Sequence, residues 1–84
     1  DNPAYMDTYG WVLYKNGKYA DAKTYIQKAL DILPTDRELL EHMGDVQYQL
    51  GNKQEALVYW KKSKENGNKS AQLEKKINEG ILLD

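Results

Sequence analysis

One group of side chains has both the chemical types and the spacing of metal ligands. Glu38 lies four residues before His42 and Asp45 lies three residues after it, so a helix would carry all three on one side. Imidazole nitrogen and carboxylate oxygen both bind zinc. Three ligands on a single helix make a weak site, however, and the sequence indicates no ligand on a second helix. We therefore expect neither a metal site nor a bound cofactor.

Catalysis is not indicated by the residue types either. His42 is the only histidine, the chain has no cysteine, and no glycine-rich loop of the phosphate-binding type occurs. A mechanism with two carboxylates is compatible with the composition, but no spacing favours it. We expect the chain to be a binding or structural protein and not an enzyme.

A basic stretch with neighbouring aromatic residues is the remaining candidate. One interpretation is nucleic-acid binding, as in an RNA-binding helical repeat. The other is a solvated outer helix face with the aromatic rings turned inward. Residues 51–84 carry seven Lys or Arg against five Asp or Glu, a small surplus for binding a phosphate backbone. We favour the solvated face and expect no nucleic-acid partner. The stretch contains Lys61, Lys62, Lys64 and Lys69, with Tyr59 and Trp60 nearby.

The length of the chain, 84 residues, corresponds to one domain with a small core. No apolar run approaches the roughly 20 residues that cross a bilayer, so no membrane insertion is expected. The chain begins Asp1-Asn2-Pro3, without a methionine and without the pattern of a signal peptide. This start favours a fragment of a longer protein.

The segments that position these residues repeat with a period of 34. Eight residues coincide at this single offset, and no gap is needed. A fixed period of this length indicates a helical repeat protein. The coincident pairs are Gly10 and Gly44, Val12 and Val46, Tyr14 and Tyr48, Gly17 and Gly51, Ala22 and Ala56, Tyr25 and Tyr59, Lys28 and Lys62, and Leu39 and Leu73.

Each repeat unit has the pattern of two helices, and a fifth helical pattern follows the second unit. Apolar residues recur at helical spacing within each of these five segments. The apolar side of the fifth segment is predicted to cover the last helix pair with Leu73, Ile77 and Ile81. The breaks between segments fall near Gly17, Pro34, Gly51 and Gly67.

Polar residues at the predicted helix starts favour these boundaries, because their side chains accept hydrogen bonds from free backbone N–H groups. The expected caps are Asn2 for the first helix, Thr35 with Glu38 as a capping box for the third, Asn52 with Glu55 for the fourth, and Ser70 for the fifth. Small residues within the helices predict a close approach of paired helix axes. These are Gly10, Ala22, Gly44 and Ala56.

These residues resemble the tetratricopeptide repeat family, whose 34-residue motif is W-x2-L-G-x2-Y, A-x3-F and P. The first unit reads Met6-x2-Tyr9-Gly10-x2-Leu13, then Ala22-x3-Ile26, then Pro34. The second reads Leu40-x2-Met43-Gly44-x2-Gln47, then Ala56-x3-Trp60, with Asn68 at the proline position. Gln47 and Asn68 depart from the motif, whereas most other changes exchange one apolar residue for another.

The resemblance implies an all-α fold of the α–α superhelix type, with two antiparallel helix pairs and one capping helix. A single domain, 1–84, would consist of repeat 1 (3–36), repeat 2 (37–70) and a closing helix (71–84). The implied function is a protein-interaction scaffold that binds a peptide or helix of a partner in a concave groove. The alternative is a structural segment of a longer solenoid, stacked on adjacent repeats and without a ligand of its own.

In this family the first helix of each pair lines the groove. Carried onto this sequence, the partner-binding residues are Asp7, Thr8, Trp11, Tyr14, Lys15, Glu41, His42, Asp45, Tyr48, Gln49, Lys75 and Lys76, with Glu38 and Gln72 on the same faces.

Trp11 is the most informative groove residue, because an exposed tryptophan in a concave surface is a natural anchor for a partner. Ordinary packing against a neighbouring repeat is the alternative. The carboxylates of Asp7, Glu38, Glu41 and Asp45 would favour a basic partner, or would simply form a solvated polar face. Some relatives clamp a partner's C-terminal carboxylate with lysine and asparagine. Asp7 and Trp11 hold the first such positions here, so no clamp is expected.

Overall fold

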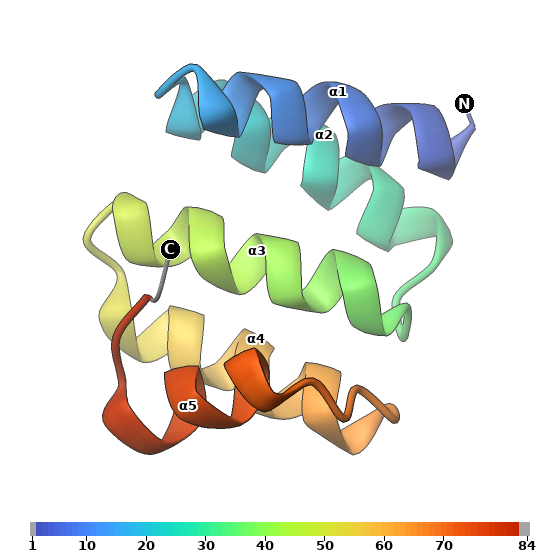
Figure 1. Ribbon diagram of the computed structural model, residues 1–84. Helices are drawn as coiled ribbons and strands as arrows, with labels where there is room; N and C mark the ends of the chain where they lie inside the picture. Colours follow the sequence, from blue (N-terminus) through green and yellow to red (C-terminus); the bar gives the residue numbers. More distant parts are fainter. Residues whose placement is uncertain (1, 83–84) are drawn as a thin grey trace.

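The computed structural model describes residues 2–82, and all regular secondary structure in this range is helical (Figure 1). The helices are α1 (Pro3–Lys15), α2 (Tyr19–Ile32), α3 (Arg37–Gln49), α4 (Lys53–Glu65) and α5 (Ala71–Glu79). The predicted all-α fold of α–α superhelix type is confirmed. Within the described residues, no helix has the length and hydrophobicity that crossing a membrane requires.

The five helices form two layers. Helices α1, α3 and α5 lie on one face, and α2 and α4 lie behind them (Figure 1). Helix α2 packs against both α1 and α3, and α4 packs against both α3 and α5. Within each pair the connecting turn is short because Gly17 and Gly51 adopt positive φ values of 77° and 89°. The front layer therefore joins residues that are far apart in the sequence into one surface.

Helix α3 begins one residue later than the sequence predicted. Its N-cap is Asp36, whose Oδ1 accepts hydrogen bonds at 3.0 Å from the backbone N–H groups of Glu38 and Leu39. The prediction of a capping box at Thr35 was therefore wrong. An ionised carboxylate also interacts favourably with the helix dipole, which a threonine hydroxyl does not do to the same extent.

The other predicted caps have mixed outcomes. The side chains of Asn2 and Ser70 accept backbone N–H bonds at 2.9 and 3.4 Å, as predicted. Asn52 occupies the N-cap position of α4 but makes no capping bond. Its side-chain amide instead donates to Gln47 Oε1 at 2.8 Å, and this bond connects the end of the turn to α3. The predicted cap was wrong because this side-chain bond competes with it.

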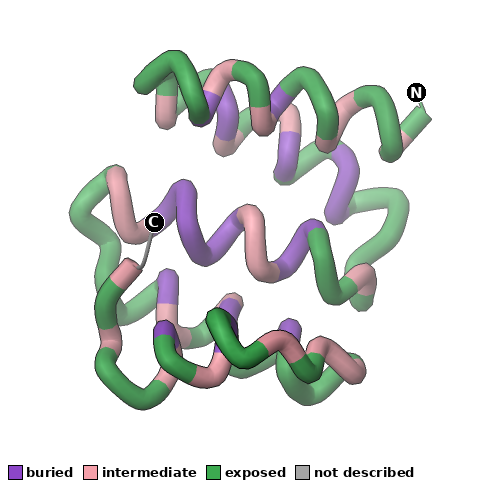
Figure 2. The backbone as a smooth tube through the Cα atoms, in the orientation of Figure 1, coloured by how far each residue is buried: buried purple, intermediate pink, exposed green. Residues whose placement is uncertain are grey.

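Figure 2 shows that each of the five helices contains buried residues. The apolar core has a larger cluster of buried residues from α1, α2 and α3, and a smaller cluster between α4 and α5, formed by Ala56, Trp60 and Leu73. Leu73 is fully buried and Ile77 packs against the same cluster, as predicted for a closing helix. Ile81 does not take part, because α5 ends before it and Ile81 is 40% exposed. The prediction of three covering residues was wrong at this position.

Two helix glycines permit the close approach within each pair, as predicted. A Cβ at Gly10 would lie 2.8 Å from Ile26 Cγ1 and 3.4 Å from the carbonyl oxygen of Ala22. A Cβ at Gly44 would overlap the Trp60 ring and lie 3.1 Å from the Ala56 carbonyl oxygen. The Trp60 ring is fully buried, so it has no space into which to move.

The first testable expectation concerns Gly44→Ala. Alanine gains about 1 kcal/mol of helix propensity over glycine, but overpacking of a core costs about 1–3 kcal/mol. We expect a net loss of about 1 kcal/mol of unfolding free energy, or about 4–8 °C in thermal midpoint. Gly10→Ala should lose less, since the Ile26 side chain is more flexible than an indole. A raised midpoint for Gly44→Ala would show that propensity outweighs packing.

Candidate functional site

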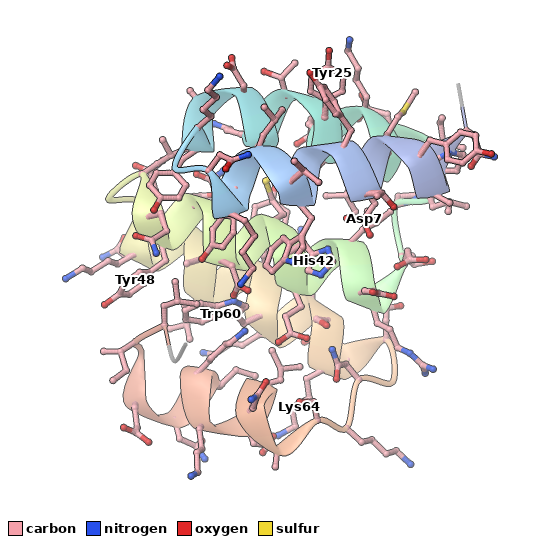
Figure 3. The ribbon with its side chains drawn as sticks, turned by 45° about the horizontal axis from the view of Figure 1, so that its top comes forward. Asp7, Tyr25, His42, Tyr48, Trp60 and Lys64 are labelled. Atoms are coloured by element: carbon pink, nitrogen blue, oxygen red, sulfur yellow. The ribbon has the colours of Figure 1, made fainter. Side chains whose placement is uncertain are left out.

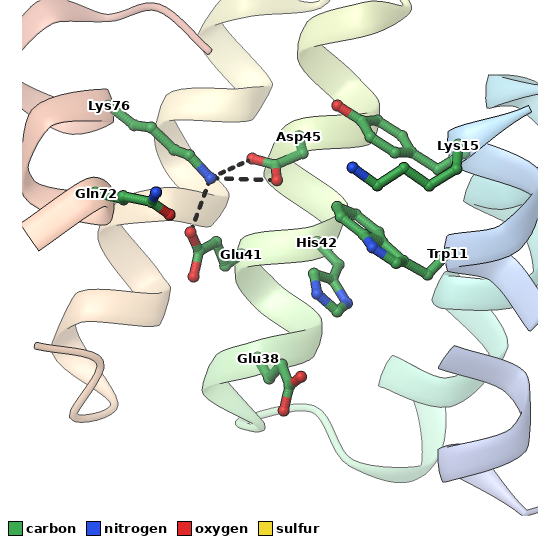
Figure 4. Close-up of a pocket in the computed structure, with 9 residues that line it drawn as sticks. Trp11, Lys15, Glu38, Glu41, His42, Asp45, Gln72 and Lys76 are labelled. Atoms are coloured by element: carbon green, nitrogen blue, oxygen red, sulfur yellow. Dashed lines mark hydrogen bonds and ion pairs between the residues drawn. The ribbon is translucent and has the colours of Figure 1, made fainter. Parts of the chain in front are cut away.

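A groove of about 470 Å³ lies on the face formed by α1, α3 and α5 (Figure 4). Most of the predicted binding residues line it, and they come from all three helices of the front layer. The lining residues are Trp11, Tyr14, Lys15, Glu38, Glu41, His42, Asp45, Gln72 and Lys76.

The remaining predicted residues are not among those that line the groove. Thr8 is exposed and its hydroxyl donates to a backbone carbonyl of its own helix at 2.9 Å. Tyr48 stacks on Trp60 with ring centroids 5.9 Å apart. Gln49 donates to the Tyr14 hydroxyl at 3.5 Å. Asp7 contacts a groove residue and lines a neighbouring hollow, whereas Lys75 is exposed.

Two acid–base pairs cross between the front helices at the repeat period. In the first rung, Asp7 Oδ1 of α1 lies 2.7 Å from His42 Nδ1 of α3 (Figure 3). In the second rung, Glu41 Oε2 of α3 accepts a hydrogen bond from Lys76 Nζ of α5 at 2.8 Å. Asp7 and Glu41 differ by 34 positions, as do His42 and Lys76. The same contact between a carboxylate and a base therefore recurs one repeat later, with Lys76 in place of His42.

Lys76 is the centre of a buried polar cluster. Besides Glu41, its Nζ donates to both carboxylate oxygens of Asp45, at 3.0 and 3.2 Å (Figure 4). Asp45 Oδ1 also accepts a hydrogen bond from Trp60 Nε1 at 3.0 Å. Lys76 and Asp45 are only 4% and 5% exposed. Lys76, which was predicted to bind a partner in the groove, therefore links α5 to α3.

Burial and charge shift the pKa values of this cluster in opposite directions. Burial raises the pKa of Asp45, and Lys76 and Trp60 only partly offset this effect. Burial alone would lower the pKa of Lys76, but the hydrogen bond to Glu41 and the charge of Asp45 raise it above its usual value. For Glu41, burial opposes ionisation, yet Lys76 lowers the pKa overall. Lys76 thus stays charged at neutral pH.

The first rung is less deeply buried. Burial would lower the pKa of His42, but the hydrogen bond and charge of Asp7 raise it above the usual value, with further contributions from Glu38 and Asp45. The side chains of His42 and Asp7 are 17% and 20% exposed. A solute in the groove therefore meets this pair more readily than the Lys76 cluster.

Three rings form a stack at the α1 side of the groove. Trp11 stacks on Tyr14, with centroids 4.5 Å apart, and on His42, with centroids 4.1 Å apart. Lys15 Nζ lies 5.5 Å from the centre of the Trp11 ring. Part of the Trp11 surface packs against its neighbours, and the half-buried ring also lines the groove.

Comparisons with known proteins agree with this architecture. The sequence model of the tetratricopeptide repeat family matches residues 3–36. The chain is also 44% identical over 45 residues to a TPR repeat-containing protein of Pseudomonas aeruginosa. Residues 3–36, the first helix pair, are therefore a tetratricopeptide repeat. The match with the Pseudomonas protein covers 54% of this chain and 8% of the relative, so most of that relative has no counterpart here.

Tetratricopeptide repeat domains are in general non-enzymatic scaffolds that bind proteins or peptides. Sequence reasoning identified the residues of both rungs in this chain but missed their pairing. It also did not indicate that Asp7 of α1 reaches His42 of α3. An available signal was the spacing of 35 residues between acid and base, which occurs in both rungs.

Proposed function

We propose that the groove binds a segment of a partner protein that carries a basic side chain. The observation that carries this proposal is the charge of the lining. Glu38, Glu41 and Asp45 supply three carboxylates, and Lys15 and Lys76 supply two ammonium groups. Asp7 adds a fourth carboxylate next to the groove. Complementary charge favours encounter with a basic segment and disfavours an acidic one.

The carboxylates of the groove differ in availability. Asp45 and Glu41 are bound to Lys76, and Asp7 is bound to His42. Glu38 is exposed at the edge of the groove. We therefore propose that Glu38 meets the basic group of the partner, while the Trp11 ring contributes apolar contact.

A charge reversal at Glu38 tests this proposal without a known partner. Peptides are selected from a random displayed library on the wild-type chain, and their affinities for Glu38→Lys are then measured. We expect selection of Lys- or Arg-containing peptides and a loss of about 1 kcal/mol, or about fivefold in Kd, which diminishes at high salt. Glu65→Lys, an exposed change on α4, is the matched control and should leave Kd unchanged. Equal losses in both variants would contradict groove binding.

A second expectation concerns peptides that end in acidic residues. Carboxylates outnumber ammonium groups around the groove, so the groove should repel the anionic end of such a peptide. The Asp7 carboxylate is already hydrogen-bonded to His42, and Trp11 offers no amide donor for a terminal carboxylate. Calorimetric titration with an acidic C-terminal peptide should show no saturable heat. Specific micromolar affinity would overturn the proposed preference for basic partners.

The alternative function, a segment of a longer solenoid, is supported by a different surface. Tyr5, Tyr9 and Val12 form an exposed stripe along α1, with 76%, 50% and 50% of each residue exposed. The residues 34 positions later, Leu39, Met43 and Val46, are all buried in the cluster that α2 shares with α3. By analogy, the stripe on α1 would pack against the second helix of a preceding repeat, as α3 packs against α2. The two functions are compatible, because the stripe and the groove use different sides of α1.

A further inference from the structure

We propose that Asp7, Glu38 and His42 form a site for a transition-metal ion such as Zn²⁺ at the α1 edge of the groove. Each residue offers one ligand atom, and these atoms all lie within 4.8 Å of one another. The ligands come from two helices, since Asp7 belongs to α1 and the other two to α3 (Figure 3). This site goes beyond the proposed capture of a protein segment and does not depend on it.

The geometry requires only a small adjustment. His42 Nδ1 and Asp7 Oδ1 are 2.7 Å apart as a hydrogen-bonded pair. Around a tetrahedral zinc ion with bonds of about 2.0–2.2 Å, neighbouring ligand atoms lie about 3.4 Å apart. The pair would therefore open by less than about 1 Å, which side-chain torsions can supply. Glu38, four residues before His42 on an exposed part of the same helix face, is free to complete the set.

The surroundings of the three residues favour a cation. Asp7 and Glu38 line a hollow of about 220 Å³ together with Asp36, and no basic side chain belongs to its described lining. Asp36 already serves as the N-cap of α3. Glu38 is exposed, and the partner of the Asp7 carboxylate is His42, which is itself one of the three proposed ligands. The stacked Trp11 ring restricts the orientation of the His42 imidazole.

The second rung shows what distinguishes this site. At the positions 34 residues later, Glu41 replaces Asp7, Gln72 replaces Glu38 and Lys76 replaces His42. Lysine there supplies its own positive charge and closes the rung internally. The first rung also joins two helices of the front layer, but it carries an imidazole and an extra carboxylate, which are the two changes that ligation requires.

The donor set also indicates the class of metal. Imidazole suits Zn²⁺, Ni²⁺, Co²⁺ and Cu²⁺, whereas Mg²⁺ and Ca²⁺ prefer six or more oxygen ligands. One nitrogen and two carboxylates leave a position for water or for a group of a partner. We therefore infer a site for the first class of ions.

Calorimetric titration of the 84-residue chain with Zn²⁺ tests the site. We expect one ion per chain, no displacement by tenfold excess Mg²⁺, and a thermal midpoint that rises with Zn²⁺. Glu38→Gln and His42→Lys introduce the residues of the second rung, so both should fold, and each should weaken binding at least about tenfold. Glu65→Gln is the control and should bind as the wild type does. Absence of saturable binding by the wild type, or unchanged binding by His42→Lys, would overturn the site.

Discussion

Replacing Lys76 with alanine is expected to lower the free energy of unfolding by about 3–5 kcal/mol, the range for breaking a buried ion pair by removing one partner. The reason is that the ammonium group satisfies Asp45 and Glu41 at once, in a site that is nearly closed to solvent. Without it, Asp45 keeps only the hydrogen bond from Trp60. The corresponding fall in thermal midpoint is about 12–40 °C.

Lys75→Ala is the matched control for this experiment. Lys75 is the preceding residue of the same helix and is exposed, so its removal should change the midpoint little. The double variant Asp45→Asn with Lys76→Met also neutralises the more deeply buried of the two carboxylates and should recover part of the loss. Glu41 keeps its charge in this variant and retains the hydrogen bond from Asn68. Equal midpoints for Lys76→Ala and Lys75→Ala would show that the buried cluster does not stabilise the fold.

Trp11→Ala is expected to weaken the binding of groove-selected peptides by about 2 kcal/mol, or about thirtyfold in Kd. The Trp11 ring lines the groove and is already oriented by Tyr14 and His42, so a partner need not immobilise it. Loss of these ring contacts should also reduce stability by about 0.5–1.5 kcal/mol or somewhat more. The helical circular dichroism spectrum should remain that of the wild type.

Tyr5→Ala is the control for Trp11→Ala, because it removes an exposed aromatic ring from the same helix on the side away from the groove. Its affinity for the selected peptides should equal that of the wild type. If Trp11→Ala loses stability but keeps full affinity, Trp11 is a packing residue and the groove has no aromatic anchor.

The helices were predictable because their signals are local. Apolar spacing and the glycine breaks indicated all five, and the period of 34 indicated how they pair. The capping errors arose where two acceptable residues are adjacent, as with Thr35 and Asp36, or where a side chain has a competing partner, as with Asn52. Local spacing cannot decide between such alternatives. A helix cap contributes about 1 kcal/mol of stability, and two acceptable caps differ by less than that.

The groove was predictable only in part. The resemblance indicated which helix faces meet, so it identified Trp11, Glu41 and His42 as neighbours of one surface. It did not indicate that Lys76 is buried, because a lysine in a polar pattern usually stays in solvent. Only the three-dimensional arrangement shows that two carboxylates surround its ammonium group. A contact between two residues that are 35 positions apart leaves no pattern in the local sequence. The only sequence pattern that indicates these contacts is that the same acid–base spacing recurs in both rungs.

The central proposal, capture of a protein segment in the groove, is tested most directly by mapping where a selected basic peptide binds. The ¹⁵N-labelled chain is titrated with the peptide, and the amide chemical shifts are followed by NMR. We predict that the largest changes fall on the groove faces of α1, α3 and α5, around Trp11, His42 and Gln72. Largest changes at Tyr5, Tyr9 and Val12, or on the outer surfaces of α2 and α4, would contradict the groove as the binding site.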